Sequence, residues 1–138
     1  MADTLKLEIV TPEGWGYTDD VEMVTVPSPH GEMGILPMHV PLVTEVCAGE
    51  VIVRKDGRES FYAVGNGFIR ITADRVAIFT DMAIHAENID EAAAEEARRR
   101  AEARLAEDLD DEENAMVSAT LAHSLAQLHV KHRHHRPA

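Results

Sequence analysis

The chain has 138 residues and carries 13 Lys and Arg against 25 Asp and Glu, which gives a formal net charge of −12 at pH 7. This length suits one domain or a compact domain with a small appendage, and it excludes a large multidomain enzyme. The negative field repels nucleic acid and anionic membrane surfaces, so neither is expected as a direct partner.

A single cysteine, Cys47, excludes an intramolecular disulfide and a cysteine-based zinc site. The N-terminal run MADTLKLEIV lacks the basic and apolar segments of a secretory signal. No stretch approaches the roughly 20 apolar residues that span a bilayer. We therefore expect any membrane association to be indirect, through a partner protein.

The first half of the chain holds short runs of β-branched and alternating residues. All eight glycines lie between Gly14 and Gly67, and glycine marks turns. Turn-like separators at 55–59 and 72–75 predict hairpins, and a charged face on each strand indicates a sheet with one solvated face. The expected architecture is an antiparallel β-sandwich, with strands predicted at 5–10, 21–26, 49–55, 60–64, 68–72 and 75–80.

The segment from Ser28 to Leu42, SPHGEMGILPMHVPL, is the most unusual part of this half. Its prolines exclude a regular central strand, so we expect an exposed apolar loop. Such a loop is typical of a partner-binding surface. A small metal-dependent enzyme is disfavoured, because His30, Glu32 and His39 lack the spacing of a metal or acid–base site.

After Ala86 the chain becomes rich in Ala, Glu and Arg and contains no glycine, which predicts helices. Asn88 or Asp90 is the expected N-cap of a first helix, in which small or apolar residues recur at every fourth position: Ile89, Ala93, Ala97, Ala101, Leu105 and Leu109. The acidic run 107–114 interrupts it. A second helix is predicted from Glu112 to His132, with one stripe formed by Val117, Leu121, Leu125 and Leu128.

These two helices predict an antiparallel hairpin. Alanine faces bury little area, so the hairpin is expected either to dock on the sandwich or to leave it for a partner. Two basic clusters can contact an acidic partner or be simply solvated: Arg98, Arg99, Arg100 and Arg104, and then Lys131, Arg133 and Arg136. No nucleophile elbow, phosphate loop, paired carboxylates or metal site is visible, so the chain is not expected to be an enzyme.

Five motifs follow one another in a characteristic order. SPHGEMGILPMHVPL is followed by VGNGFIRI at 64–71, VAIFTDMA at 76–83, IDEA at 89–92 and LAHSLAQLHV at 121–130. Together they resemble the epsilon-subunit family of bacterial and chloroplast F-type ATP synthases over essentially the whole chain. The resemblance implies a β + α fold, with an N-terminal antiparallel β-sandwich of about ten strands over 1–86 and a C-terminal two-helix antiparallel hairpin over 87–138.

The resemblance also implies a non-catalytic central-stalk subunit of a proton-translocating synthase. Its partners would be the gamma subunit, the membrane c-subunit ring and the beta/alpha catalytic head, at the cytoplasmic face of the bacterial plasma membrane. One rotor-binding end of the sandwich would contact gamma and the c-ring through His30, Gly31, Glu32, Met33, Pro37, His39 and Pro41. The helices would inhibit ATP hydrolysis through Arg98, Arg99, Arg100 and Arg104, and more weakly through Lys131, Arg133 and Arg136.

Some family members bind ATP through an Ile/Leu-Asp-x-x-Arg-Ala signature. Here Ile89, Asp90 and Ala94 match, but Ala93 stands at the arginine position. Arginine is a bidentate phosphate partner that alanine cannot replace, so ATP binding is expected to be weak or lost, and no cofactor is expected. The same difference disfavours the alternative function, a stand-alone ATP-sensing nucleotide-binding domain. The histidine-rich tail leads us to expect stronger inhibition on acidification.

Overall fold

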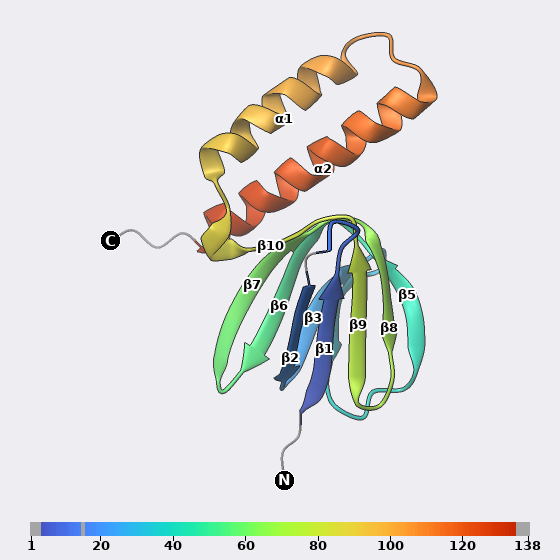
Figure 1. Ribbon diagram of the computed structural model, residues 1–138, viewed down its shortest axis with the longest axis vertical. Coiled ribbons are helices and arrows are strands. Elements are labelled where there is room, and N and C mark those ends of the chain that lie inside the picture. Colours follow the sequence, from blue (N-terminus) through green and yellow to red (C-terminus); the bar gives the residue numbers. More distant parts are fainter. Residues whose placement is uncertain (1–3, 15, 135–138) are drawn as a thin grey trace, which may run out of the picture.

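The structure, a computed structural model, describes residues 4–14 and 16–134. Figure 1 shows a β-sandwich with a two-helix hairpin at one end. The first sheet has the strand order β2 (Gly16–Val21), β1 (Leu5–Val10), β9 (Arg75–Thr80), β8 (Gly67–Ile71) and β5 (Leu42–Val46). The second sheet has the order β10 (Ala83–His85), β7 (Arg58–Val64), β6 (Gly49–Lys55), β3 (Met23–Ser28) and β4 (Gly31–Ile35). The predicted β-sandwich followed by a helical hairpin is therefore confirmed.

Among the strands of residues 4–14 and 16–134, all pairs are antiparallel except one. Both predicted hairpins are present, since β6 turns into β7 and β8 turns into β9. The exception is β1, which runs parallel to β9 with Lys6 opposite Arg75. No tight turn joins these two strands, so nothing in the local sequence fixes their relative direction.

The sequence patterns missed four strands and shifted another. The predicted strand at 21–26 is β3, which begins at Met23 and follows the polar edge strand β2. A strand, β4, occupies part of the segment expected to be a loop. β4 pairs only with β3 among the described strands, so it is an edge strand, and Pro29 and Pro37 lie outside it rather than within it.

The main core lies between the two sheets. Its buried aliphatic side chains alternate along the strands with exposed ones: Leu5, Leu7, Ile9, Val21, Val24, Val26, Ile35, Val46, Val51, Val53, Ile69, Ile71, Val76 and Ile78. At one open side of the sandwich, Lys55 Nζ of β6 donates to Asp19 of β2 at 2.7 Å. This hydrogen bond lowers the pKa of the Asp19 carboxyl and links the two sheets.

A short 3₁₀ turn, η1 (Ala86–Asn88), leads from the sandwich into helix α1 (Glu91–Leu105). Asp90 is the N-cap of α1, as one of the two predicted options, and its Oδ1 accepts from the Ala93 amide at 3.0 Å. The helix ends at Leu105 and not at Leu109. Its buried residues are Ala94 and Ala101 rather than the predicted stripe at every fourth position. Residues four apart are rotated by about 40° around the helix axis, so such a stripe does not stay on one face.

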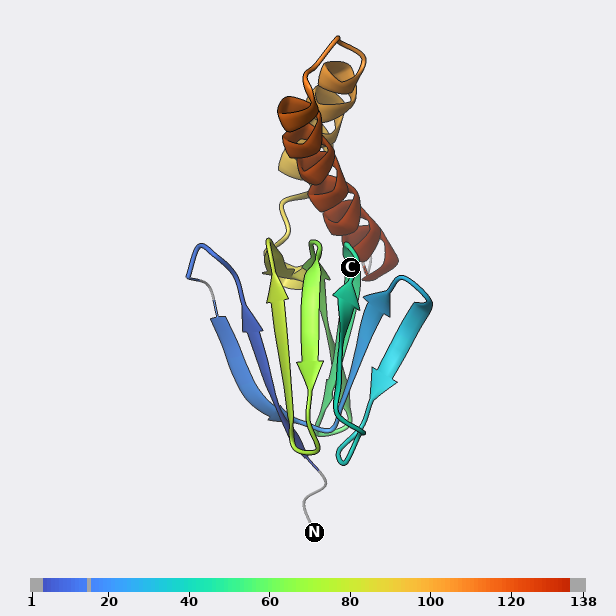
Figure 2. The same cartoon turned by 90° about the vertical axis from the view of Figure 1, so that its right-hand side faces the viewer.

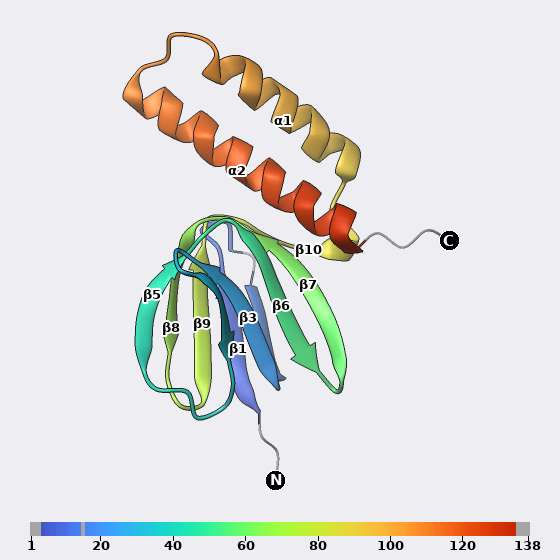
Figure 3. The same cartoon turned by 180° about the vertical axis from the view of Figure 1, so that it is seen from behind.

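Helix α2 (Asp111–His134) carries three acidic residues in its first turn, as the helix dipole favours. Its predicted stripe is partly wrong, since Leu125 is 48% exposed whereas Ser124, Ala126, Leu128 and Val130 are buried. The helices are antiparallel, and α2 is the one that lies against the sandwich (Figures 1 and 3). Within the described part of the chain, no helix is long and apolar enough to cross a membrane.

Gly67 offers a test of how closely the strands of the first sheet approach each other. A Cβ at position 67 would lie 1.8 Å from the carbonyl oxygen of Phe79, whereas at Gly16 the nearest atom is 3.7 Å away. Gly67→Ala should therefore lower the free energy of unfolding by about 2 kcal/mol or more. Gly16→Ala should change it by less than about 0.5 kcal/mol in the same urea titration. Equal effects would contradict this packing.

Candidate functional site

The hairpin rests on the outer face of the second sheet, near one end. Glu50 of β6, Ala63 of β7 and Ile84 of β10 are cross-strand neighbours there. Ala126 and Val130 of α2 cover this row, and together they form a second, smaller apolar cluster with Ile89, Phe61, Met82 and Ala86. Only four residues of this cluster are fully buried and two of them are alanines, so it buries much less apolar area than the main core.

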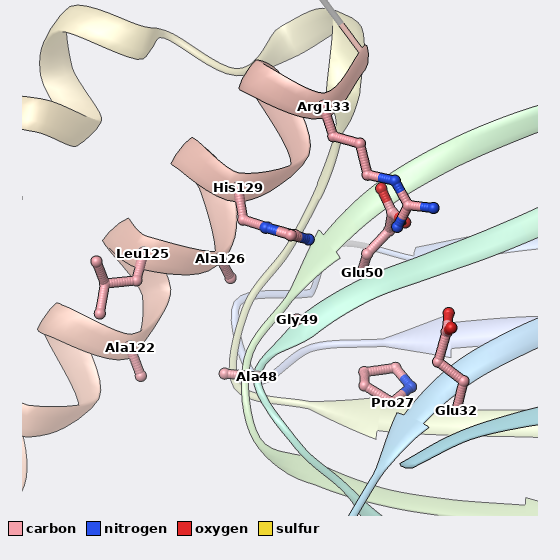
Figure 4. Close-up of a pocket in the computed structure, with 10 residues that line it drawn as sticks. All are labelled: Pro27, Glu32, Ala48, Gly49, Glu50, Ala122, Leu125, Ala126, His129 and Arg133. Carbon is pink, nitrogen blue, oxygen red and sulfur yellow. The ribbon is translucent and has the colours of Figure 1, made fainter.

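A buried carboxylate lies beside this apolar cluster. The Glu50 side chain is 5% exposed and accepts from Arg133 Nη1 at 2.8 Å. Its second oxygen contacts His134 Nε2, and the His134 ring stacks on Phe61 with centroids 3.5 Å apart. Figure 4 shows Arg133 reaching down from α2 toward Glu50. A buried carboxylate without a cation is strongly unfavourable, so this contact selects the docked position of α2.

Two further polar contacts join α2 to the first domain. Lys131 Nζ donates to the Ala86 carbonyl at 3.3 Å. His123 Nε2 lies 3.0 Å from Asp81 Oδ1, in a close contact that is not aligned as a hydrogen bond. The basic residues Lys131 and Arg133, predicted as inhibitory contacts, are thus engaged within the chain in this state. Arg136 lies outside the described residues.

An open groove of about 530 Å³ separates α2 from the β3–β4 hairpin (Figure 4). Its sandwich side includes Pro27, Glu32 and Glu50, and its helix side includes Leu125 and His129. The turn of the β3–β4 hairpin is braced by Ser28, whose Oγ donates to the Gly31 carbonyl at 2.7 Å. His30, Gly31 and Glu32 are exposed, and Met33 is half-buried.

The remaining predicted rotor contacts, Pro37, His39 and Pro41, lie at the other end of β4. We name the segment 36–43 the distal loop. Its Met38 amide donates to the Ala73 carbonyl at 2.7 Å, which places it beside the β8–β9 turn, far from the hairpin (Figure 2). The expectation of a single rotor-binding end is therefore wrong, because the strand β4, at about 3.3 Å per residue, separates the two sets.

The distal loop is apolar and exposed. Its exposed apolar side chains are Leu36, Met38, Val40, Leu42 and Val43, with Met38 79% exposed. His39 Nδ1 and the Val40 carbonyl oxygen are 2.7 Å apart, a contact that holds the ring against the backbone. A contiguous exposed patch of this kind indicates a binding surface.

A second apolar surface, on the outer face of the first sheet, was missed in the sequence. Val10, Phe79 and Phe68 are neighbours across β1, β9 and β8, and the two phenylalanine rings stack with centroids 4.9 Å apart. Phe68 is 50% exposed. We call these three residues the aromatic row. The signal in the sequence was the unbroken apolar run from Val76 to Phe79, which is typical of a strand covered on both faces.

The arginine cluster of α1 faces solvent but is balanced by acidic neighbours. Arg98 contacts Glu95 and Glu102, and the hydrogen bond from Arg98 lowers the pKa of Glu95. Arg104 pairs with Glu107 and Glu113. Arg99 and Arg100 are 68% and 72% exposed. The helix carries four glutamates and four arginines, so it presents pairs of opposite charge rather than a positive surface.

The predicted nucleotide-binding positions have structural roles in this state. Ile89 is 4% exposed in the apolar cluster under α2, and the Asp90 carboxylate caps α1. Ala93 is exposed and adds no charge. Across residues 4–14 and 16–134, no group of three or more His, Cys, Asp or Glu could hold a metal ion.

Comparisons with known proteins agree along the chain. The model of the family described as ATP synthase, Delta/Epsilon chain, beta-sandwich domain matches residues 4–86, and that of the corresponding long alpha-helix domain matches residues 87–131. The ATP synthase epsilon chain of Alkalilimnicola ehrlichii is 39% identical over 136 residues, covering 98% of this chain and 97% of the relative. That of Bacillus subtilis is 44% identical over 108 residues, covering 78% and 82%.

A solved structure shares the fold. A chain of the Euglena gracilis mitochondrial ATP synthase, in a structure described as OSCP/F1/c-ring in rotational state 1, superposes with a TM-score of 0.70 at 23% identity. The match covers 88% of this chain and 78% of that chain.

The Glu50 contact can be tested by removing its charge. Glu50→Gln leaves Arg133 and His134 without their carboxylate, so amide exchange in the buried turn around Ala126 to Val130 should quicken by about tenfold or more. Glu8→Gln is the matched control, since it breaks an exposed pair with Arg75 on the opposite sheet. That control should leave α2 exchange unchanged. Unchanged exchange in Glu50→Gln would contradict the assignment.

Proposed function

The chain belongs to the ATP synthase delta/epsilon chain family, and we propose that it is the non-catalytic central-stalk subunit that joins gamma to the membrane c-ring. Two features support this role: the sandwich has a rigid core, and it presents apolar and polar surfaces at separate places. A stiff body with several separate contact surfaces transmits force between partners and loses little entropy on docking. We place it at the cytoplasmic face of the membrane, attached through its partners.

We assign the apolar surfaces to gamma and the polar β3–β4 turn to the c-ring. The aromatic row and the distal loop expose side chains that water solvates poorly, which suits a lasting protein interface. The turn at His30, Gly31 and Glu32 is exposed, polar and internally braced, which suits the polar loops of the ring. The aromatic row is the one of these three surfaces that the sequence patterns did not predict.

The gamma assignment predicts that truncating a side chain of the aromatic row weakens binding to the gamma subunit. Phe68→Ala removes the most exposed ring of the row, so the Kd for the gamma subunit should rise by about tenfold or more, as for other buried aromatic anchors. Glu59→Ala, an exposed change on the second sheet, should leave the Kd unaltered. Both variants must keep the wild-type melting temperature. An unchanged Kd for Phe68→Ala would contradict the assignment of the aromatic row to the gamma interface.

The hairpin is the proposed regulatory part. In the docked state Arg133 is bound to Glu50, so it cannot reach an acidic residue of the catalytic head. The arginines of α1 are solvent-facing, but glutamates on the same hairpin pair with them. Inhibition of ATP hydrolysis therefore requires the hairpin to leave the sandwich, after which acidic residues of the head compete for Arg98, Arg99, Arg100 and Arg104 and for Lys131 and Arg133.

A hydrolysis assay tests this role directly. The catalytic head carrying gamma should hydrolyse ATP more slowly with the full-length chain than with a chain ending at Ala86, provided that both bind. Replacing Arg98, Arg99, Arg100 and Arg104 by alanine should relieve at least half of the inhibition, by about twofold in rate or more. Replacing Glu112 by alanine, at an exposed site in the first turn of α2, is the control. Equal rates with full-length and truncated chains would refute a regulatory hairpin.

We propose that the chain binds ATP weakly or not at all. We also propose that it needs no cofactor. Asp90 is already used as a helix cap, and Ala93 offers no cation for a phosphate. The same geometry gives no support to a stand-alone nucleotide sensor.

A further inference from the structure

Met38, in the distal loop, is held in a backbone conformation that its residue type rarely adopts. Its φ angle is 69°, in the left-handed region, where the Cβ of an L-residue crowds the following carbonyl oxygen. With Pro37 before it, Met38 occupies the second central position of a tight turn. A turn with proline at the first central position and a positive φ at the second normally has glycine or asparagine there. The chain therefore carries methionine at this position at a cost in folding stability.

The surrounding contacts fix the backbone of Met38 but leave its side chain in solvent. Its amide donates to the Ala73 carbonyl at 2.7 Å, and Pro37 and Pro41 restrict the backbone on either side. The side chain, by contrast, is 79% exposed. It gains no burial within the chain that would offset the strained backbone. Strain that is kept in this way points to a use of the side chain by a partner.

The distal loop continues into the aromatic row along the outer face of the first sheet. Val43, its last residue, lies opposite Arg70 of β8. Glu45, two residues later, lies opposite Phe68. Val43 and Phe68, which are 64% and 50% exposed, are therefore diagonal neighbours on one face, because successive side chains of a strand alternate. Strands β5, β8, β9 and β1 lie side by side (Figure 1), so this apolar surface extends from the distal loop to Val10 of β1.

We propose that Met38 is an anchor side chain for the gamma subunit, presented by a strained but preformed loop. The proposal rests on the stalk role above, and it identifies the side chain of the distal loop that carries the binding. Because the apolar surface is continuous, the partner that covers the aromatic row also reaches the distal loop. Methionine suits this position, since its unbranched, polarizable side chain fills irregular apolar pockets. A loop that already has its bound shape loses little entropy when it docks.

Asp56 provides the internal comparison. Within residues 4–14 and 16–134 it is the other non-glycine residue with a positive φ, at 53°. It lies in the two-residue turn between β6 and β7 and is followed by Gly57. Asp-Gly is a preferred pair for such a hairpin turn, and aspartate tolerates the left-handed region better than most residues. Asp56 therefore has a local reason for its conformation that Met38 lacks.

The test measures folding stability and gamma binding in the same variants of the full chain. Met38→Asn places a residue that tolerates the left-handed region in the turn, so the urea midpoint of unfolding should rise. The same change removes the apolar anchor, so the Kd for the gamma subunit should rise by about tenfold or more. Met38→Leu keeps the apolar bulk, so its Kd should stay within about threefold of the wild-type value. Asp56→Gly, a change at a positive φ on the second sheet, should leave the Kd unaltered.

A gain in stability together with a loss of affinity identifies a residue that is kept for binding. A residue with only a structural role would lose stability on substitution. An unchanged Kd for Met38→Asn, or a lowered urea midpoint, would overturn the anchor. If Phe68→Ala weakens binding in the same assay and Met38→Asn does not, the stalk role stands and only the anchor fails. If the wild-type chain does not bind gamma, both proposals fail.

Discussion

The buried carboxylate of Glu50 is the interaction on which the arrangement of the two domains depends. The apolar cluster under α2 is small, with only Ala63, Ile89, Ala126 and Val130 fully buried, so it bridges the domains with little buried area. A carboxylate that is only 5% exposed adds what this cluster lacks, because it is stable only with a cation beside it. Charge therefore selects the position of α2. The same basic side chains can instead pair with acidic residues of another protein.

The sandwich and the hairpin have opposite physical characters. The sandwich has a continuous aliphatic core between two paired sheets, and an inter-sheet ion pair between Asp19 and Lys55 closes one side. It is built to keep its shape while its surfaces bind. The hairpin has few large buried side chains, and its charges are largely satisfied on its own helices. These features suit a part that changes position as a unit, since it can leave the sandwich without exposing a large core.

The sequence predicted most of this fold, because alternation, turn residues and the change to an Ala- and Glu-rich composition are local signals. It did not reveal the polar edge strand β2 or the edge strand β4, whose pairing depends on distant neighbours. The Glu50 site was also out of reach, because its partner Arg133 lies on α2, more than 70 residues later in the chain. Apolar residues on both faces of the SFYAV run at 60–64 were the available hint that a helix covers this sheet.

The account rests on docking and inhibition excluding each other, and a reversible covalent lock tests this most directly. Ala63 of β7 and Ala126 of α2 pack in the same cluster, so cysteines at these positions, with Cys47→Ser, should join the hairpin to the sandwich. ATP hydrolysis by the catalytic head with gamma is then measured before and after reduction. The account predicts no inhibition by the oxidised chain and recovered inhibition after reduction. Full inhibition by the oxidised chain would contradict it.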